Sequence, residues 1–170
     1  MLIQQNVDGS KFFNRSWAEF KVGFNDSVGN YWLGNELLSQ LTATGRNKLR
    51  FDLRSRNNSN WYYAEYSTFR VGTEADNYRL QVAGYWGNAG WDAFGWHNGM
   101  MFSTHDRDND VAAWGNCASY TGGGFWHKNC ATCDVNTPRV SSAENNEFSW
   151  DGLPGGHLLQ STRMWLQCRL

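Results

Sequence analysis

The chain has 170 residues, of which 41% are hydrophobic and 16% aromatic, enough to bury one substantial core. A formal net charge of -1 and a pI near 6.4 leave no basic field that would hold a nucleic acid or an anionic membrane. No apolar run approaches the roughly 20 residues that span a bilayer, so we expect no membrane insertion. We predict a single domain over residues 1–170.

Two short helices are predicted near the N-terminus. Ser16-Trp-Ala-Glu19 has the pattern of a capping box, and Gly23 is a typical stop after the helix that follows. A second helix is expected over residues 35–41, because three leucines there share one face after the capping-competent Asn35.

From residue 49 the hydrophobic period changes from helix to strand. Residues 49–53 alternate apolar with charged side chains, which predicts a half-buried strand. Residues 61–71 and 78–85 are rich in aromatic and β-branched types, and the turn-forming segment 72–77 separates them. These segments predict an antiparallel meander, and the alternation over residues 164–168 predicts a final strand that returns to the sheet.

Residues 99–151 show almost no sustained periodicity. A loop of that length in a compact domain is uncommon unless it is functional, a linker, or held by cross-links or metal. Several large hydrophobic side chains argue against a disordered linker: Met100, Phe102, Trp114, Phe125, Trp126 and Trp150. We therefore expect an ordered loop region, fastened by cross-links, that carries the function.

An acidic run within this region places a carboxylate at every second position, at Asp106, Asp108 and Asp110. Calcium takes roughly six to eight oxygen ligands with tolerant geometry, and the small Ala112 that follows offers a carbonyl. The run lacks the glycine and the glutamate that an EF-hand needs. The alternative is a solvated acidic turn, because Asp and Asn readily cap their own backbone.

The four cysteines are compatible with two disulfides in three connectivities: Cys117, Cys130, Cys133 and Cys168. The Cys130-x-x-Cys133 spacing also matches a thiol redox motif or half a zinc site, but no second such pair accompanies it. A bridge between Cys117 and Cys130 would close a short loop and contribute about 3 kcal/mol.

Between these cysteines, three consecutive glycines let the backbone approach a ligand, and aromatic and polar side chains flank them: Tyr120, Phe125, Trp126 and His127. This combination suits a shallow ligand pocket, whereas the alternative is that Phe125 and Trp126 are ordinary core. The histidines show no metal-ligand spacing and no serine sits in a nucleophile elbow. We therefore predict that the protein is not an enzyme.

Three tripeptides satisfy the N-glycosylation pattern, at Asn14, Asn25 and Asn57. All lie in polar stretches that we expect to be exposed. They favour a secreted, extracellular protein, although such tripeptides also arise by chance.

Short motifs occur in order along nearly the whole chain: Val7-Asp-Gly-Ser10, Tyr31-Trp-Leu-Gly-Asn35, Leu49-Arg-Phe-Asp-Leu53, Phe102-Ser-Thr104, Asp106-Arg-Asp-Asn-Asp110, Gly115-Asn-Cys-Ala118, Phe125-Trp126, Lys128-Asn-Cys130 and Ser161-Thr-Arg-Met164. In this order they resemble the fibrinogen-like (fibrinogen-related, ficolin- or tachylectin-like) domain. The resemblance implies an α+β fold with a small antiparallel β-sheet, short helices and a long, calcium- and disulfide-stabilised loop region. It also implies that the family's N-terminal segment is truncated here.

The resemblance further implies a disulfide between Cys117 and Cys130 and a Ca²⁺ site in the acidic run. Its ligands would be the carboxylates of Asp108 and Asp110 and the main-chain carbonyls of Ala112 and Trp114. Asp106 would stand behind these ligands without touching the ion.

The lectin-like members of the family bind acetylated sugars beside the calcium loop, and the corresponding residues here are Tyr120, Phe125, Trp126, His127, Asn129, Cys130 and Ala131. The resemblance implies a cis peptide between Asn129 and Cys130. The sequence departs from the family where Ala131 replaces a usual histidine, where residues 134–138 replace an Asn-Gly-Tyr segment, and where Cys133 is inserted. Recognition of N-acetyl groups therefore cannot be carried over intact, and parity suggests a second bridge between Cys133 and Cys168.

On this basis we expect a secreted, calcium-dependent pattern-recognition lectin of innate immunity, binding carbohydrates or acetylated groups on microbial surfaces. The full-length protein would be an oligomer, because one sugar site is weak and multivalency adds affinity. The alternative is a protein-binding module in extracellular matrix, clotting or receptor-ligand signalling.

Overall fold

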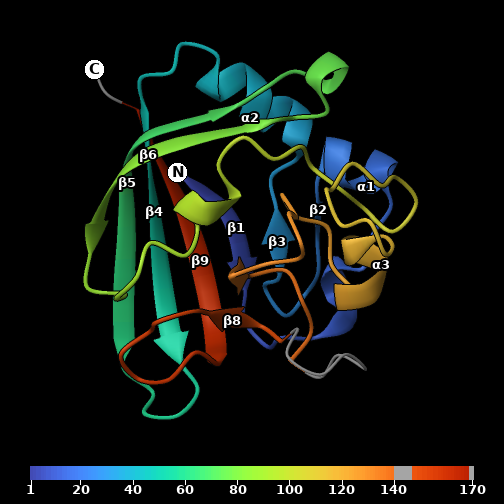
Figure 1. Cartoon of the computed structure of the whole chain (residues 1–170). Coiled ribbons are helices and arrows are strands. Elements are labelled where there is room, and N and C mark those ends of the chain that lie inside the picture. The colour runs from blue at the N-terminus through green and yellow to red at the C-terminus, as the bar shows by residue number, and fades with distance from the viewer. Residues whose placement is uncertain (140–146, 169–170) are drawn as a thin grey trace.

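The computed structural model describes residues 1–139 and 147–168, and Figure 1 shows long strands on one side and short helices with loops on the other. The main sheet has seven antiparallel strands in the order β2-β3-β1-β9-β4-β5-β6. Its strands are β1 Leu2–Asn6, β2 Phe24–Asn25, β3 Tyr31–Trp32, β4 Asn47–Ser55, β5 Trp61–Val71, β6 Leu80–Gly87 and β9 Leu159–Cys168. A second, two-stranded sheet pairs β7 Cys133–Asp134 with β8 Ser149–Trp150.

In the part of the chain that the structure describes, three short α-helices and three 3₁₀ turns connect the strands. The helices are α1 Trp17–Val22, α2 Asn35–Thr42 and α3 Cys117–Thr121, and the turns are Lys11–Phe13, Glu74–Asp76 and Gly95–His97. None of the described helices combines the length and the apolar character required to cross a bilayer.

The two predicted helices form, and α2 needs two corrections of detail. The capping box of α1 is complete, because the Ser16 side chain accepts from the Glu19 N–H while the Glu19 carboxylate accepts from the Ser16 N–H. Helix α2, however, is capped by Gly34, so Asn35 is its first residue. The shared leucine face is only partly buried, because Leu37 is 43% exposed while Leu38 is buried.

The meander and the final strand are confirmed, and the alternation is strictest in the central strand β4. In β4 every second side chain from Asn47 is buried, and the side chains between them face outward. Phe51 pairs in register with Met164 of β9 and with Ala64 of β5, so one apolar face runs across the centre of the sheet. The opposite face, which carries Arg50 and Asp52, remains open.

The described parts of the loop region, taken here as residues 99–139 and 147–158, cover the inner face of the sheet. Trp150 of β8 packs edge-on against Phe51 with ring centroids 5.1 Å apart, and Phe94 lies 4.9 Å from the same ring. Trp126 contacts Trp32 and Phe102 from the other side of this core. The α+β fold class predicted from the sequence is confirmed, and aromatic packing is one of the contacts that order the long loop.

Candidate functional site

The predicted disulfide is present between Cys117 and Cys130, whose Cα atoms lie 5.4 Å apart. Cys117 is the first residue of α3, and Asn116 caps that helix because its side-chain oxygen accepts from the Ser119 N–H at 3.1 Å. The bridge therefore fastens α3 to the segment that leads into β7. The peptide bond between Asn129 and Cys130 is cis, as the family resemblance implied.

The suggested second bridge is wrong, because Cys133 is a free and fully buried thiol. In the β7–β8 ladder the backbone of Cys133 lies opposite that of Trp150. The Trp150 ring packs on Phe51, and Phe51 is in register with Met164 of β9, so Cys133 lies near the Met164 end of the contact with β9. Cys168 lies farther along β9, roughly 13 Å from Met164 at the rise of an extended strand. The prediction of a Cys133–Cys168 disulfide, which rested on the even number of cysteines alone, is therefore wrong.

Asp106 belongs to the packing of α1. Its Oδ1 accepts from the Trp17 N–H at 2.9 Å and from Thr104 Oγ1 at 2.7 Å. Burial would raise the pKa of Asp106, but these hydrogen bonds outweigh it, and the pKa lies below its usual value. Asp106 is thus fixed as a carboxylate that anchors the first turn of α1.

Asp108 and Asp110 lie together in the turn before α3. The Asp110 N–H donates to Asp108 Oδ1 at 3.2 Å, while the Asp110 carboxylate accepts from the N–H groups of Ala112 and Cys117, each at 2.8 Å. Burial raises the pKa of Asp110, and repulsion from the Asp108 carboxylate raises it further. The two hydrogen bonds from Ala112 and Cys117 lower it, but the net pKa is above its usual value. A bound cation would relieve the repulsion between the two carboxylates.

The oxygen donors of this turn fit a hard divalent cation. Each Asp110 oxygen accepts one N–H and keeps a free lone pair, and Ala112 lies directly against that carboxylate. Across residues 1–139 and 147–168, no group of three or more His, Cys, Asp or Glu side chains has the arrangement of a metal site. An ion here would therefore take its remaining ligands from main-chain carbonyls and water, a set that calcium tolerates.

Three of the predicted pocket residues are core residues, which corrects the sequence-based assignment. Phe125, Trp126 and His127 each have 0% exposed surface. Trp126 Nε1 donates to the Tyr78 carbonyl at 2.8 Å, and His127 Nε2 lies 2.9 Å from the Gly123 carbonyl oxygen. Side chains that are packed and hydrogen-bonded in this way cannot line a ligand pocket without unfolding their surroundings.

The other predicted pocket residues divide into two places. Trp114 and Tyr120 meet edge-on with ring centroids 5.0 Å apart on the surface, and Trp114 Nε1 donates to Asn129 Oδ1 at 2.9 Å. Cys130 is nearly buried by its disulfide. Ala131 lies instead at the rim of a separate cavity.

This acidic cavity has a volume of about 630 Å³ and is lined by Ala131, Asp134, Glu147, Ser149, Asp151, Gly152, His157 and Leu158. The pairing of β7 with β8 places its walls, since Asp134 is in register with Ser149. The Asp151 N–H donates to the Thr132 carbonyl at 2.9 Å, which holds Asp151 against the segment before β7. Three carboxylates and one histidine thus surround one space, where a cationic group would be favoured.

The buried carboxylate of Asp134 is the most constrained group in the acidic cavity. Its Oδ1 accepts from the Asn136 N–H at 3.1 Å, whereas Oδ2 has no hydrogen-bond partner among the described residues and lies 3.9 Å from His127 Nε2. Burial raises the pKa of Asp134, and burial likewise raises the pKa of Asp151. Leaving a buried carboxylate oxygen unpaired is costly, so Asp134 makes the wall of the cavity acidic at the expense of stability, while the less buried Glu147 and Asp151 are the carboxylates that a ligand can reach.

Most of this cavity is not predicted from the sequence. Asp134 enters the predictions only as part of the substituted segment 134–138, and Glu147, Asp151 and His157 do not enter them. No spacing signals them, because the two-residue strands β7 and β8 bring them together from positions far apart in the sequence. The three glycosylation sites, Asn14, Asn25 and Asn57, are exposed and remain predictions.

Comparison with known proteins places the whole fold in one family. The family model for the fibrinogen beta and gamma chains, C-terminal globular domain, matches residues 1–168. Angiopoietin-related protein 2 of Mus musculus is 44% identical over 129 residues, which are 76% of this chain and 26% of that protein. Fibrinogen-like protein A of Apostichopus parvimensis is 38% identical over 159 residues, 91% of this chain and 55% of that protein.

Two solved structures agree with this assignment. The fibrinogen-like globe domain of human ANGPTL2 superimposes with a TM-score of 0.89 at 36% identity, over 99% of this chain and 80% of that one. The lamprey fibrin D-dimer, complexed with the peptide ligand Gly-His-Arg-Pro-amide, gives a TM-score of 0.83 at 30% identity, over 97% and 60% of the two chains. The protein therefore belongs to the family of the C-terminal globular domain of the fibrinogen beta and gamma chains.

Proposed function

We propose that this protein is a secreted, non-enzymatic protein-binding module that takes a cationic peptide segment of its partner into the acidic cavity. The observation that carries the proposal is the cavity itself, a space of about 630 Å³ whose lining includes the acidic residues Asp134, Glu147 and Asp151. A guanidinium or amine entering it would pair with these acidic groups, of which Asp151 has a charged form that burial otherwise destabilises. The disulfide between Cys117 and Cys130 supports secretion, because such bridges persist in oxidising compartments.

The relatives support a protein partner over a sugar. The similar proteins carry the names angiopoietin-related protein, fibrinogen and tenascin, and the lamprey fibrin structure holds a peptide that contains arginine. A cavity rich in carboxylates is suited to such a peptide by charge.

The leading expectation from the sequence, a lectin for acetylated sugars, has less support. Phe125, Trp126 and His127 were to form its pocket, and all three are buried. Ala131 adds no hydrogen-bonding group in place of the usual histidine. The protein-binding alternative is therefore the better proposal.

Calcium has a structural role in this proposal. Asp108 and Asp110 would hold the ion, with the carbonyls of Ala112 and Trp114 completing its shell. Bound there, the ion would stabilise the turn that leads into α3 and, through the Cys117–Cys130 bridge, the segment ahead of β7. The cavity wall formed by Asp134 begins only a few residues later.

Titration calorimetry with the peptide Gly-His-Arg-Pro-amide tests the proposal. We expect Asp151→Asn and Glu147→Gln each to weaken binding about tenfold, the equivalent of about 1.4 kcal/mol. A peptide with norleucine in place of arginine should lose most of its affinity. Asp76→Asn is the charge-matched control, because Asp76 is an exposed carboxylate outside the cavity lining that pairs with Arg79 on the surface.

The measurements distinguish binding in the acidic cavity from attraction by bulk charge and from sugar binding. Equal weakening by Asp76→Asn and Asp151→Asn would mean that bulk charge, not the cavity, attracts the peptide. Tight binding that depends on neither cavity carboxylate, or binding of acetylated sugars that the peptide cannot displace, would overturn the proposal.

A further inference from the structure

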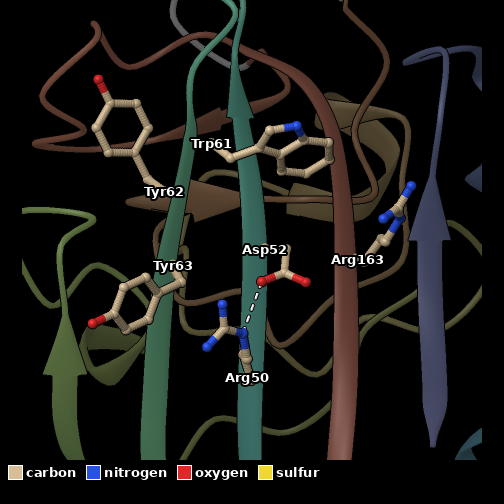
Figure 2. A pocket seen from close by; sticks show the side chains of 6 residues that line it. All are labelled: Arg50, Asp52, Trp61, Tyr62, Tyr63 and Arg163. Carbon is tan, nitrogen blue, oxygen red and sulfur yellow. Dashed lines mark hydrogen bonds and ion pairs between the residues drawn. The ribbon is translucent and has the colours of Figure 1, made fainter.

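The outer face of the sheet carries a second concave site, away from the loop region. This sheet hollow has a volume of about 230 Å³ and is lined by Arg50, Asp52, Trp61, Tyr62, Tyr63 and Arg163. Figure 2 shows Asp52 at its centre, with Trp61, Tyr63, Arg50 and Arg163 around it, while Tyr62 points away. The side chains come from three adjacent strands, β4, β5 and β9, so a paired ladder fixes their positions.

The polar floor of the sheet hollow is already organised. Asp52 Oδ1 accepts from Arg50 Nε and Asp52 Oδ2 accepts from Trp165 Nε1, each at 2.8 Å. Each oxygen keeps a lone pair for a further donor. Arg50 Nη1 also donates to Glu65 at 2.9 Å, which fixes the guanidinium between two carboxylates. Such a floor accepts and donates hydrogen bonds without having to rearrange.

Aromatic rings form the rim of the sheet hollow. Trp61 is 45% exposed, and the Arg163 guanidinium lies 5.3 Å from the centre of its ring. The Arg50 guanidinium lies 4.6 Å from the Tyr63 ring, and Trp86, which is 65% exposed, extends the aromatic surface with its ring 5.4 Å from Tyr63. Exposed tryptophan at this density is unusual on a sheet face unless something covers it.

Arg163 contributes a positive charge to the sheet hollow that is not paired with a carboxylate of the described residues. Its Nε donates to Gln5 Oε1 at 3.0 Å, and within the described part of the chain it takes part in no ion pair. Arg50, by contrast, is paired with Asp52 and Glu65. The two terminal nitrogens of Arg163 are therefore available for a bidentate contact with a carboxylate or sulfate.

We propose that the sheet hollow binds a saccharide that carries a carboxylate or sulfate group. One apolar face of the sugar ring would stack on Trp61, where its slightly positive C–H groups meet the negative face of the indole. Hydroxyl groups would donate to the Asp52 carboxylate, and the acidic substituent would pair with Arg163.

Size and chemistry favour a sugar over a protein surface. The hollow is smaller than the roughly 300–1,000 Å³ of pockets for drug-sized ligands, and it has room for one sugar ring. Its floor presents acceptor and donor groups side by side beneath an aromatic rim, which matches a ring that is apolar on its face and hydroxylated at its edge. A protein partner would have to bury roughly 800 Å² of this side.

This site is separate from the proposed peptide site. Trp150, beside the acidic cavity, packs on the inner face of β4 through Phe51, whereas Arg50 and Asp52 project from the outer face of the same strand. The two ligands would therefore bind independently, and failure of either proposal would leave the other standing.

Calorimetry with acidic oligosaccharides tests the inference. A hyaluronan octasaccharide provides carboxylates, a heparin octasaccharide provides sulfates as well, and chitotetraose is the neutral probe. We expect at least one acidic probe to bind and chitotetraose to bind at least tenfold more weakly. Trp61→Ala and Arg163→Gln should each weaken binding at least tenfold, whereas Trp61→Phe, which keeps an aromatic face, should stay within about threefold.

Arg70→Gln is the matched control for Arg163→Gln, because Arg70 is exposed on the same sheet at the far end of β5. It should leave the affinity unchanged, while equal weakening by both substitutions would indicate nonspecific attraction and overturn the inference. No binding of either acidic probe at millimolar concentration would also overturn it. So would a result in which Trp61→Ala changes only self-association by sedimentation, which would mark the hollow as a protein contact. Thermal unfolding of each variant verifies that the fold is retained.

Discussion

The sheet and the loop region of this domain are ordered by different forces. In the sheet, alternating side chains bury one face and ladder hydrogen bonds satisfy the backbone. In the loop region, buried polar side chains satisfy the backbone instead. Asn136 Nδ2 donates to the Gly124 carbonyl at 2.9 Å, and Asn6 Nδ2 donates to the Val135 carbonyl at 3.0 Å. The disulfide adds a covalent constraint.

This difference explains where binding groups can reside. A strand in the centre of the sheet keeps most of its inward residues apolar, as β4 does at Leu49, Phe51 and Leu53, so its open face has more freedom to vary. The loop region needs particular polar residues at a few anchoring points, and the side chains between them can serve a ligand. Both proposed sites follow this rule, one on the open face of the sheet and one between loop segments.

The largest effect is expected where the two regions meet. Trp126 packs against Trp32 and Phe102 and is fully buried, so Trp126→Ala should cost about 3–5 kcal/mol of unfolding free energy. Denaturant unfolding measures this cost. Trp114→Ala is the matched control, because Trp114 is 56% exposed and should cost much less. Similar costs for both would contradict the assignment of Trp126 to the core.

Removal of the disulfide should affect the two regions unequally. Cys117→Ser combined with Cys130→Ser should cost about 3 kcal/mol, as expected for a bridge across a sequence separation of 13. Hydrogen exchange should show lost protection in α3 and β7, with little change in β4 and β5. A uniform loss of protection would mean that the loop region and the sheet unfold as one cooperative unit.

Calcium should likewise act on the loop region. At a concentration one hundred times its dissociation constant, a bound ion would stabilise the fold by about 2.7 kcal/mol, observable as a higher melting temperature than in excess chelator. Asp108→Asn should reduce this increment. Asp106→Asn should lower the melting temperature itself, because Asp106 anchors Trp17, but should leave the calcium increment intact. The reverse pattern would show that the ligands are assigned to the wrong aspartates.

Acid should weaken the loop region through His97. Its Nδ1 lies 2.9 Å from the Trp126 carbonyl oxygen, and its Nε2 accepts from the N–H groups of Thr132 and Cys133 at 3.3 and 3.4 Å. Burial lowers the pKa of His97 to about 3. Between about pH 6.5 and pH 3 the unfolded chain therefore binds a proton that the folded chain does not, and stability falls by about 1.4 kcal/mol per pH unit as pH falls.

The variant His97→Gln isolates this contribution. It should be less stable than the parent at pH 7 but should lose stability less steeply below pH 6.5, so that the two curves converge. The comparison is needed because Asp134 and Asp151, whose pKa values burial raises, contribute with the opposite sign. Parallel curves for parent and variant would show that the proton enters elsewhere.

The sequence predicts the sheet where the signal is local. Strands β4 and β5 follow from alternation and composition within a single segment, and β5 has the predicted bounds, Trp61–Val71. Strand β1 has no such signal, because its inward residues include Gln4 and Asn6. Both donate to the Val135 carbonyl, far along the sequence, so only the folded structure explains why they are buried.

The candidate site was predicted less well for the same reason. The disulfide and the acidic turn are continuous in sequence and could be recognised from the resemblance to a family. Phe125 and Trp126 follow a glycine run, and the sequence leaves both a ligand surface and ordinary core open for them, whereas long-range packing makes them core. The acidic cavity depends on a pairing of Asp134 with Ser149 between distant segments, which no local pattern indicates.

The most direct test of the central claim is a backbone-amide NMR titration with Gly-His-Arg-Pro-amide. We predict saturable shifts that are largest for Ala131, Asp134 and Asp151, with the amides of Arg50 and Asp52 on the outer sheet face unmoved. Shifts confined to the surface around Trp114 and Tyr120, or no saturable shifts at millimolar peptide, would contradict the account of the acidic cavity as the site for a cationic peptide.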